Sequence, residues 1–288
     1  MKKFLKLLAK ALIVLVVVAI VARIIVVMSG ESEDVIMKNS IAVIRLDGVI
    51  VDTHEIDKKL KKLDNNEKVK GIILEINSPG GLIAPTQVIY QRIMKMKKPV
   101  YAVMESIAAS GGYYIAVAAD KVYAIDSTTT GSIGVIMQYS NVEELLNKIG
   151  IKSVVFKSGK LKDVPSTTRE LSEDERKYLQ ANIDEFYEQF LRDVLKRRNI
   201  SEKKLRTLAD GRVFSGRKAF EYKLIDRLGS REEAVIDLKD EIGIQDLEVK
   251  ELYDEEESFF MKLVTKAASV KSAYVPEGGY YYLYKPGL

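Results

Sequence analysis

Apolar residues in this chain occur in short continuous runs that alternate with stretches of helical spacing. The runs that predict strands are 41–46, 69–76, 100–104, 122–125 and 151–156. Continuous apolar runs are typical of parallel strands that are covered on both faces of a sheet. Apolar positions three and four residues apart predict the helices between them, at 54–63, 85–97, 110–119 and 142–149. Because strands and helices alternate, the sequence predicts an α/β fold with a mainly parallel sheet.

The chain becomes mainly helical beyond residue 170. Ser172 and Glu175 form a capping-box pattern that predicts a helix start, and apolar positions continue this helix to about Arg198. A second capping-box pattern begins at Ser230, and the spacing over 254–272 is compatible with a last helix. The tyrosine-rich tail, EGGYYYLYKPGL, is compatible with disorder or with docking on another surface, and its composition does not choose between them.

The first thirty residues carry a long apolar segment. Residues 11–28 contain one charged residue, Arg23, and as a helix they would span about 27 Å, close to the ~30 Å hydrocarbon core of a membrane. They have no polar face and no clear cleavage site after them, so we expect an uncleaved anchor rather than a signal peptide or a core helix. Lysines precede the segment and acids follow it: Lys2, Lys3, Lys6, Lys10, Glu31, Glu33 and Asp34. The positive-inside rule then predicts a single-pass protein of the cell membrane, with a cytoplasmic N-terminus and an extracytoplasmic catalytic domain.

Charge and composition narrow the range of functions. The net charge of +4 comes from residues 1–30, which carry five basic residues and no acid, whereas the rest of the chain is balanced to within one charge. We therefore expect no nucleic-acid partner. The lack of Cys excludes thiol catalysis, disulfides and cysteine metal sites, and a single histidine, His54, argues against a histidine metal centre. No metal or organic cofactor is expected.

The chain is long enough for one large domain, and 47% hydrophobic residues are enough to build its core. We divide it into a membrane anchor with cytoplasmic lysines (1–30), a polar linker (31–39), a catalytic domain (40–250) and a C-terminal helix with the tyrosine-rich tail (251–288).

Two glycine-containing motifs follow predicted strands directly. Asn77–Gly81 reads NSPGG, in which Pro-Gly favours a turn and Gly-Gly lets backbone N–H groups approach a ligand. It is either an oxyanion hole at the carboxyl end of a strand or a plain connector. In the second motif Ser110 stands between Ala-Ala and Gly-Gly, where small neighbours leave room around a hydroxyl. This serine is either a nucleophile or the N-cap of a helix, and Ala108 departs from the G-x-S-x-G pattern of α/β-hydrolases.

A serine nucleophile needs a base, and the sequence offers few. His54 lies in a highly charged helix and is more consistent with a solvated surface residue. A lysine that burial keeps neutral can replace histidine. Lys157, Lys160 and Lys162 cluster in one short stretch, and their spacing alone does not choose among them. A third motif, TTTGSIG at residues 128–134, is either a turn or a group that orients a lysine or lines a peptide groove.

Taken in order, INSPGG, SIAASGGYYIA, TGSIGVI, KSGKLKD and ADGRVFSGRKAFEYKLIDRLG resemble the motifs of the signal peptide peptidase A family, also called protease IV. The resemblance covers roughly residues 40–240. It implies a Clp-protease/crotonase-type fold and a serine endopeptidase with a Ser–Lys dyad. It also implies membrane-derived peptide substrates, including signal-peptide remnants.

The resemblance assigns roles to individual residues. It implies Ser110 as the nucleophile, Lys162 as the base, and backbone N–H groups of Gly81 and Gly111 as the oxyanion hole. Ser132 would position the lysine. This chain has a single copy of the catalytic unit, and short members of the family resemble homo-oligomeric rings in which a neighbouring subunit can supply the lysine.

Three alternative functions are compatible with the same residues. The first is a membrane serine protease of the type that cleaves stomatin-like proteins. The second is a crotonase-like enzyme acting on acyl-CoA, which an extracytoplasmic location disfavours. The third is a catalytically silent scaffold that only binds hydrophobic peptides.

Overall fold

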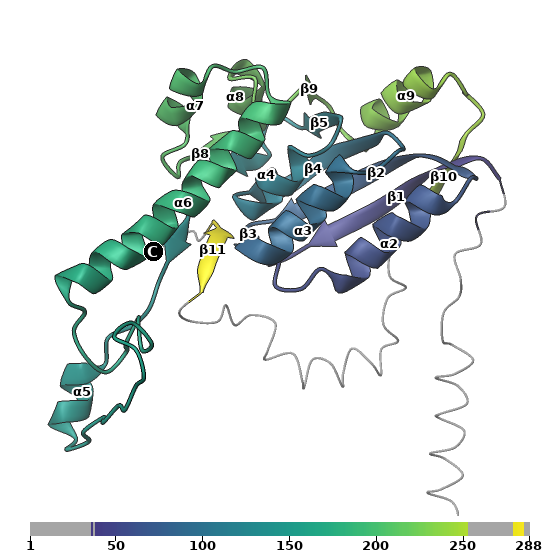
Figure 1. The fold of residues 1–288 in the computed structure, drawn as a ribbon. Helices are drawn as coiled ribbons and strands as arrows, with labels where there is room; N and C mark the ends of the chain where they lie inside the picture. Colours follow the sequence, from purple (N-terminus) through teal and green to yellow (C-terminus); the bar gives the residue numbers. More distant parts are fainter. Residues whose placement is uncertain (1–35, 37, 253–278, 285–288) are drawn as a thin grey trace, which may run out of the picture. The chain divides into compact units, whose positions relative to one another are not determined.

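The computed structural model describes residues 36, 38–252 and 279–284 (Figure 1). The chain separates into two compact units, Met1–Met37 and Lys38–Leu288, and all of the helices and strands described lie in the second unit. The predicted anchor at 11–28 and the helix predicted at 254–272 lie outside the described residues. In the described ranges no helix is both long enough and apolar enough to cross a membrane.

The core of the second unit is a mainly parallel sheet. Its strands run in the order β10 (Glu248–Glu251), β1 (Ser40–Asp47), β2 (Val69–Ser78), β4 (Val100–Ala109), β5 (Lys121–Ala124) and β9 (Arg227–Leu228). All of these neighbours pair in parallel. A branch adds β6 (Thr129–Gly131), parallel to the end of β4, and β8 (Val213–Ser215), antiparallel to β6. The predicted α/β class with a mainly parallel sheet is confirmed.

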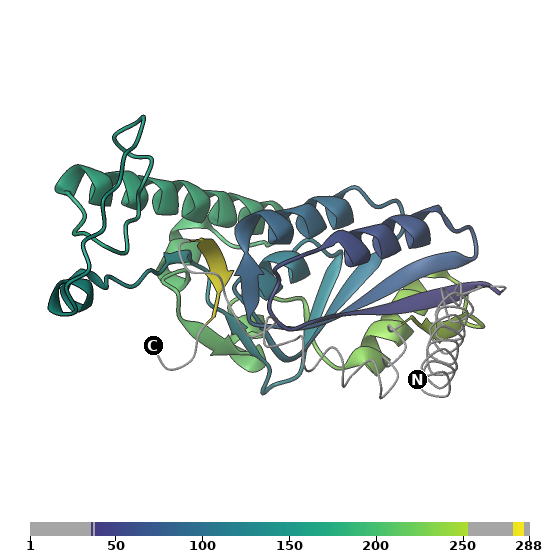
Figure 2. The same cartoon turned by 90° about the horizontal axis from the view of Figure 1, so that it is seen from below.

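Helices cover both faces of this sheet, which explains why its strands are apolar without alternation. α2 (His54–Asn65) and α3 (Ile83–Met94) lie on one face, and α9 (Arg231–Ile242) lies on the other (Figures 1 and 2). Ala234 and Leu238 of α9 are fully buried against strand residues such as Ile41, Ile73 and Tyr101. The sheet is therefore a rigid platform with its loops at the two ends of the strands.

Further helices and a second, three-stranded sheet build the rest of the unit. The helices are α4 (Gly111–Ala116), α5 (Glu143–Lys148), α6 (Glu173–Arg197), α7 (Glu202–Leu208) and α8 (Gly216–Glu221). The second sheet has the order β3 (Gly80–Leu82), β11 (Tyr280–Leu283) and β7 (Ile136–Met137), with antiparallel pairing throughout. The sequence left open whether the tyrosine-rich segment is disordered or docked. Its strand β11 docks between β3 and β7.

Most predicted elements are present with shifted ends, and one is wrong. Both capping boxes form, at Ser172 and at Ser230. The helix predicted at 110–119 is shorter, at Gly111–Ala116. The strand predicted at 151–156 does not form, and all six of its residues are exposed. An apolar run forms a strand only where a partner strand supplies acceptors and donors for its backbone groups. No described strand pairs with residues 151–156.

Candidate active site

The NSPGG and SGG motifs meet where β2 and β4 end. β2 and β4 pair again at Ser78 and Ala108, beyond an irregularity after Ile76, so the two loops leave the sheet side by side. A Cβ atom on Gly112 would lie 2.6 Å from the carbonyl oxygen of Ser78, and one on Gly80 would lie 2.6 Å from the amide nitrogen of Gly111. The glycines are therefore required because the backbones of the two loops touch.

Ser110 has an unusual backbone conformation at this junction. Its φ is 54° and its ψ is −115°, a region that non-glycine residues rarely adopt. Two hydrogen bonds hold it there: its N–H donates to the carbonyl of Gly131 at 2.8 Å, and its carbonyl accepts from the N–H of Tyr114 at 2.8 Å. Such a conformation costs about 1–3 kcal/mol and persists only where surrounding structure enforces it.

The hydroxyl of Ser110 does not act as a helix cap. Ser110 precedes α4, yet its side chain makes no capping hydrogen bond. The residue is 1% exposed, and no hydrogen bond joins its hydroxyl to another residue in the part of the chain that the structure describes. The structure thus contradicts the capping interpretation and leaves the hydroxyl available for chemistry.

Ser110 and Ser132 line the same cavity, of about 490 Å³. Ser132 follows β6 and has a positive φ of 49°, with its N–H donating to the carbonyl of Arg212 at 2.8 Å. Apolar side chains line much of the remaining wall: Val135, Ile136, Ile183, Tyr187, Ala209 and Leu283. Asp184 and Asp210 also line it, and Arg212 pairs with Asp210. The cavity therefore combines two strained serines with a largely apolar wall.

Gly111 and Gly81 lie on the two loops that meet beside Ser110. Gly111 is the first residue of α4, so its N–H has no acceptor within the helix. Gly81 is the middle residue of β3 and pairs with Tyr282 of β11. The structure therefore brings Ser110, Ser132 and Gly111 to one place, with Gly81 on the adjoining strand.

Lys162 is not at this cavity. It lies in the segment 138–171, here called the arm, which contains α5 and extends from the start of α6 away from the sheet (Figures 1 and 2). Lys162 is exposed and does not line the cavity with Ser110. Within one chain, the structure therefore separates the two residues of the predicted dyad.

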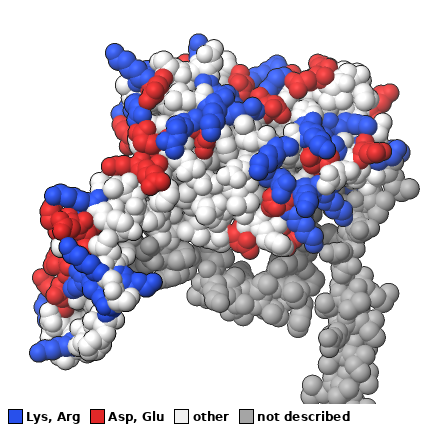
Figure 3. Space-filling view, viewed as in Figure 1, with Lys and Arg blue, Asp and Glu red and all other residues white. Residues whose placement is uncertain are grey.

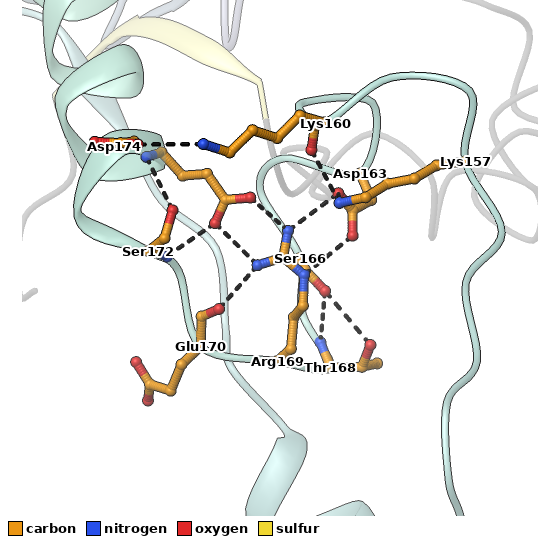
Figure 4. Close-up of polar contacts among 10 residues, drawn as sticks. Lys157, Lys160, Asp163, Ser166, Thr168, Arg169, Glu170, Ser172 and Asp174 are labelled. Carbon is orange, nitrogen blue, oxygen red and sulfur yellow. Dashed lines mark hydrogen bonds and ion pairs between the residues drawn. The ribbon is translucent and has the colours of Figure 1, made fainter.

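The three candidate lysines differ in their contacts, and Figure 4 shows those of Lys157 and Lys160. The ammonium of Lys157 lies 2.5 Å from Asp163, and that of Lys160 lies 3.2 Å from Asp174. No ion pair to a described residue involves Lys162. Of the three, Lys162 is the one whose amine forms no ion pair with a carboxylate in the part of the chain that the structure describes.

Arg169 ties the arm to the start of α6. Its guanidinium bonds to Asp163 at 3.0 Å and to Glu175 at 2.7 Å (Figure 4). Hydrogen bonds from Arg169, followed by one from Lys157, hold the pKa of Asp163 well below its usual range. Hydrogen bonds from Arg169 and from the backbone of Ser172 lower the pKa of Glu175 to about 2. These contacts hold the part of the arm that carries Lys157, Lys160 and Lys162 close to the start of α6.

The tail contributes residues that the sequence did not point to. Leu283 and Tyr284 line the cavity, and the N–H of Tyr284 donates to the carbonyl of Pro79 at 2.7 Å. Tyr282 is fully buried, and its ring packs on Tyr114 and Phe190 at centroid distances of 5.0 and 4.7 Å. The signal for this strand is the dense run of tyrosines, which sequence alone could not assign to a partner.

His54 lies elsewhere. It begins α2 and lines a different cavity, of about 450 Å³, with charged neighbours that include Asp52 and Glu55. In the described ranges, no cluster of three or more His, Asp or Glu side chains has a geometry that could hold a metal ion. The single histidine therefore does not lie beside Ser110.

Two known protein families match this chain. The model of peptidase family S49 matches residues 92–245, and the model of Clp protease matches residues 21–137. The chain belongs to peptidase family S49. It is therefore a serine peptidase, which acts on peptides, and its fold is the Clp-protease-like α/β fold.

Relatives of this S49 peptidase come from distant organisms. It is 38% identical over 246 residues to "Putative signal peptide peptidase SppA" of Enterococcus faecium, which covers 80% of this chain and 70% of the relative. It is 32% identical over 245 residues to "Protease 4" of Haemophilus influenzae, covering 79% of this chain and 40% of the relative. It is 30% identical over 200 residues to "Serine protease SPPA, chloroplastic" of Arabidopsis thaliana, covering 68% of this chain and 30% of the relative. The family inferred from the five motifs is confirmed.

Proposed function

We propose that this S49 peptidase is a membrane-anchored endopeptidase in which Ser110 of one copy works with Lys162 of a neighbouring copy. The observation that carries the proposal is the enforced positive φ of Ser110 beside a cavity, with an uncommitted hydroxyl. Strained backbone of this kind concentrates at active sites, where it aims a reactive side chain.

A second copy supplies what one chain lacks. Lys162 stands away from the cavity of its own chain, in an arm that presents large apolar side chains to solvent. Those side chains are Leu145, Ile149, Ile151, Val154, Val155, Phe156 and Leu161. Exposed apolar surface of this extent is typical of a protein–protein contact. Docking of the arm on a neighbour covers this surface and carries Lys162 to the neighbour's cavity, and repetition of the contact builds a homo-oligomeric ring.

The proposed chemistry has two halves. The Ser110 hydroxyl oxygen attacks the scissile carbonyl carbon while its proton passes to the neutral amine of Lys162. The N–H groups of Gly111 and Gly81 stabilise the negative oxygen that forms, and the lysine then gives its proton to the leaving amine. A water molecule then gives a proton to the same amine while its oxygen attacks the acyl carbon. The ester bond to Ser110 breaks, and the lysine returns the proton to the Ser110 oxygen. Ser132, which lines the same cavity as Ser110, orients the lysine amine.

The substrate is an extended, largely apolar peptide. β11 occupies the edge of β3, and the cavity beside it has a mostly apolar wall, so we infer that an extended apolar peptide binds in the cavity itself. Peptides released from a membrane fit this description, and the name of the Enterococcus relative supports signal-peptide remnants among them. We infer that residues 11–28 anchor the enzyme and that its catalytic domain lies outside the cytoplasm, as the charge distribution of the N-terminus predicts.

A mixing experiment tests the shared site directly. Ser110→Ala and Lys162→Ala variants are each expected to be inactive on a fluorogenic apolar peptide. Because each retains the residue that the other lacks, subunit exchange between them should restore part of the activity. Labelling of the wild type by a fluorophosphonate, lost in Ser110→Ala, distinguishes the enzyme from a silent scaffold. A mixture that stays inactive although mixed oligomers form would contradict the shared site.

A further inference from the structure

Six lysines gather at the end of the sheet where the parallel strands begin, opposite the Ser110 end. They are carried by the segment before β1, the end of α2, the start of β2 and the turn after α3. We call them the lysine edge: Lys38, Lys61, Lys68, Lys70, Lys95 and Lys97. All are exposed except Lys70, which is partly buried.

Hydrogen bonds between these segments hold the lysine edge together. The N–H of Ser40, at the start of β1, donates to the carbonyl of Lys68 at 2.9 Å. The N–H of Lys97 donates to the carboxylate of Asp64 near the end of α2 at 3.0 Å. The lysines therefore belong to one surface of the folded unit, although they are up to 59 positions apart in the sequence.

This surface is strongly cationic. None of the six lysines forms an ion pair with a residue in the described ranges, and the acids beside them are Asp64, Glu67 and Asp57, which pairs with Arg92. Blue side chains accordingly gather over the ends of α2 and α3 in Figure 3. Across the sheet, the end of α9 and the turn after it instead carry the acids Asp240, Glu241 and Asp246. At this end of the sheet, the positive charge therefore lies on the side that α2 and α3 cover.

We propose that the lysine edge rests on the anionic headgroups of the membrane and orients the catalytic domain. The inference rests on the anchor in the proposed function. Residues 29–39 separate the predicted span from β1, and eleven residues reach at most about 40 Å even when fully extended. The chain enters the sheet at Ser40, within the lysine edge, so this is the end of the catalytic domain to which the anchor is joined. Lysines attract an anionic surface over about one Debye length, ~8 Å at physiological salt.

The orientation has a consequence for the substrate. β1 has eight residues, which at ~3.3 Å each separate the two ends of the sheet by roughly 26 Å. With the lysine edge on the headgroups, the Ser110 cavity opens at the far end of the strands. The enzyme then acts on peptides that have left the bilayer rather than on segments still embedded in it.

The lack of cysteine makes a clean test possible. A single Asn65→Cys substitution at the end of α2, in the full chain, takes an environment-sensitive fluorophore. In proteoliposomes that contain phosphatidylglycerol, we expect quenching by aqueous acrylamide to be about 3-fold slower than in phosphatidylcholine alone. The difference should vanish at about 0.5 M NaCl, where screening shortens the range of the attraction. A label at Thr207→Cys on α7 should show no lipid dependence.

Matched variants decide whether the lysines are responsible. Changing Lys61, Lys68 and Lys97 to Gln should abolish the lipid dependence, whereas changing Lys177, Lys203 and Lys223 to Gln, for the same loss of charge, should not. Both variants should hydrolyse a soluble peptide as fast as the wild type. Equal quenching in both lipids, or equal effects of the two variants, would overturn the inference and leave the peptidase proposal intact. Protein released from the vesicles by alkaline carbonate would overturn the anchor and this inference together.

Discussion

Ser110 is 1% exposed and its backbone is held at both ends by hydrogen bonds, whereas Phe156, in the arm that carries Lys162, is 95% exposed. The first region is built on the ends of two central strands, and its glycines touch neighbouring backbone. The arm has one short helix, α5, in which no residue is buried. This contrast between a buried serine and an exposed arm supports the proposal that a neighbouring copy completes the active site. Substitutions in each region can test this contrast, and those at the reactive groups should have the greatest effect.

Removal of the nucleophile should have the largest effect. Ser110→Ala should lower kcat by about 10⁴-fold or more, because no other group can form the acyl-enzyme. His54→Ala is the control and should stay within a few-fold of the wild type, since His54 lines a separate cavity. Peptide hydrolysis without added metal measures both. Equal damage from the two changes would contradict the assignment.

Substitutions of the three arm lysines should differ strongly in their effect on turnover. Lys162→Ala should reduce turnover by about 10³-fold or more, and Lys162→Arg should be as inactive, because guanidinium does not lose its proton between pH 5 and 10. Lys157→Ala and Lys160→Ala should be milder, since their side chains pair with Asp163 and Asp174. Initial rates across this pH range give the ranking. An active Lys162→Arg enzyme would remove Lys162 from the role of base.

The packed region can be tested at Tyr282. Tyr282→Ala should lower the free energy of unfolding by about 3–5 kcal/mol, because a buried ring against Tyr114 and Phe190 is lost. Tyr282→Phe keeps the ring and loses only the hydrogen bond to the carbonyl of Phe186. It should lower the free energy of unfolding by about 1 kcal/mol. Urea unfolding of both variants provides the measurement. A cost below 1 kcal/mol for Tyr282→Ala would show that β11 is not part of the core.

The ion pairs of the arm predict a pH dependence. The pKa of Glu175 is lowered to about 2 in the folded chain. Its contribution to stability is therefore complete above the unfolded value near 4.3 and is lost as the pH falls toward 2. Arg169→Gln should be less stable than the wild type at pH 7, and this gap should narrow as the pH approaches 2. Urea unfolding at several pH values checks this, and a constant gap would contradict it.

A substitution in the exposed arm should change the oligomeric state rather than the free energy of unfolding. Phe156→Ser should change the free energy of unfolding by no more than about 0.5 kcal/mol, because the side chain makes little contact within its own chain. It should nevertheless shift the protein toward smaller oligomers and lower its activity in parallel. Light scattering at several protein concentrations measures the shift. An unchanged oligomer with full activity would show that this part of the arm does not contact a neighbour.

Much of the fold was predictable because it depends on local patterns. The apolar runs of β1, β2 and β4 and the capping box at Ser172 are local signals that the tertiary structure preserves. Residues 151–156 show the limit, because six apolar-rich residues give the same signal whether a partner strand exists or not. The pairing of β11 with β3 was equally hidden, since it joins residues about 200 positions apart.

The family, the glycine motifs and the small residues around Ser110 could all be recognised in the linear chain, because close backbone approach demands particular residue types at particular positions. The positive φ of Ser110, the cavity that it shares with Ser132 and the separation of Lys162 from both became evident in the folded protein alone. Those properties depend on hydrogen bonds and packing between segments distant in sequence, such as that of Ser110 with Gly131. Composition and spacing identify the candidate reactive groups, but the tertiary structure determines which of them lie close together.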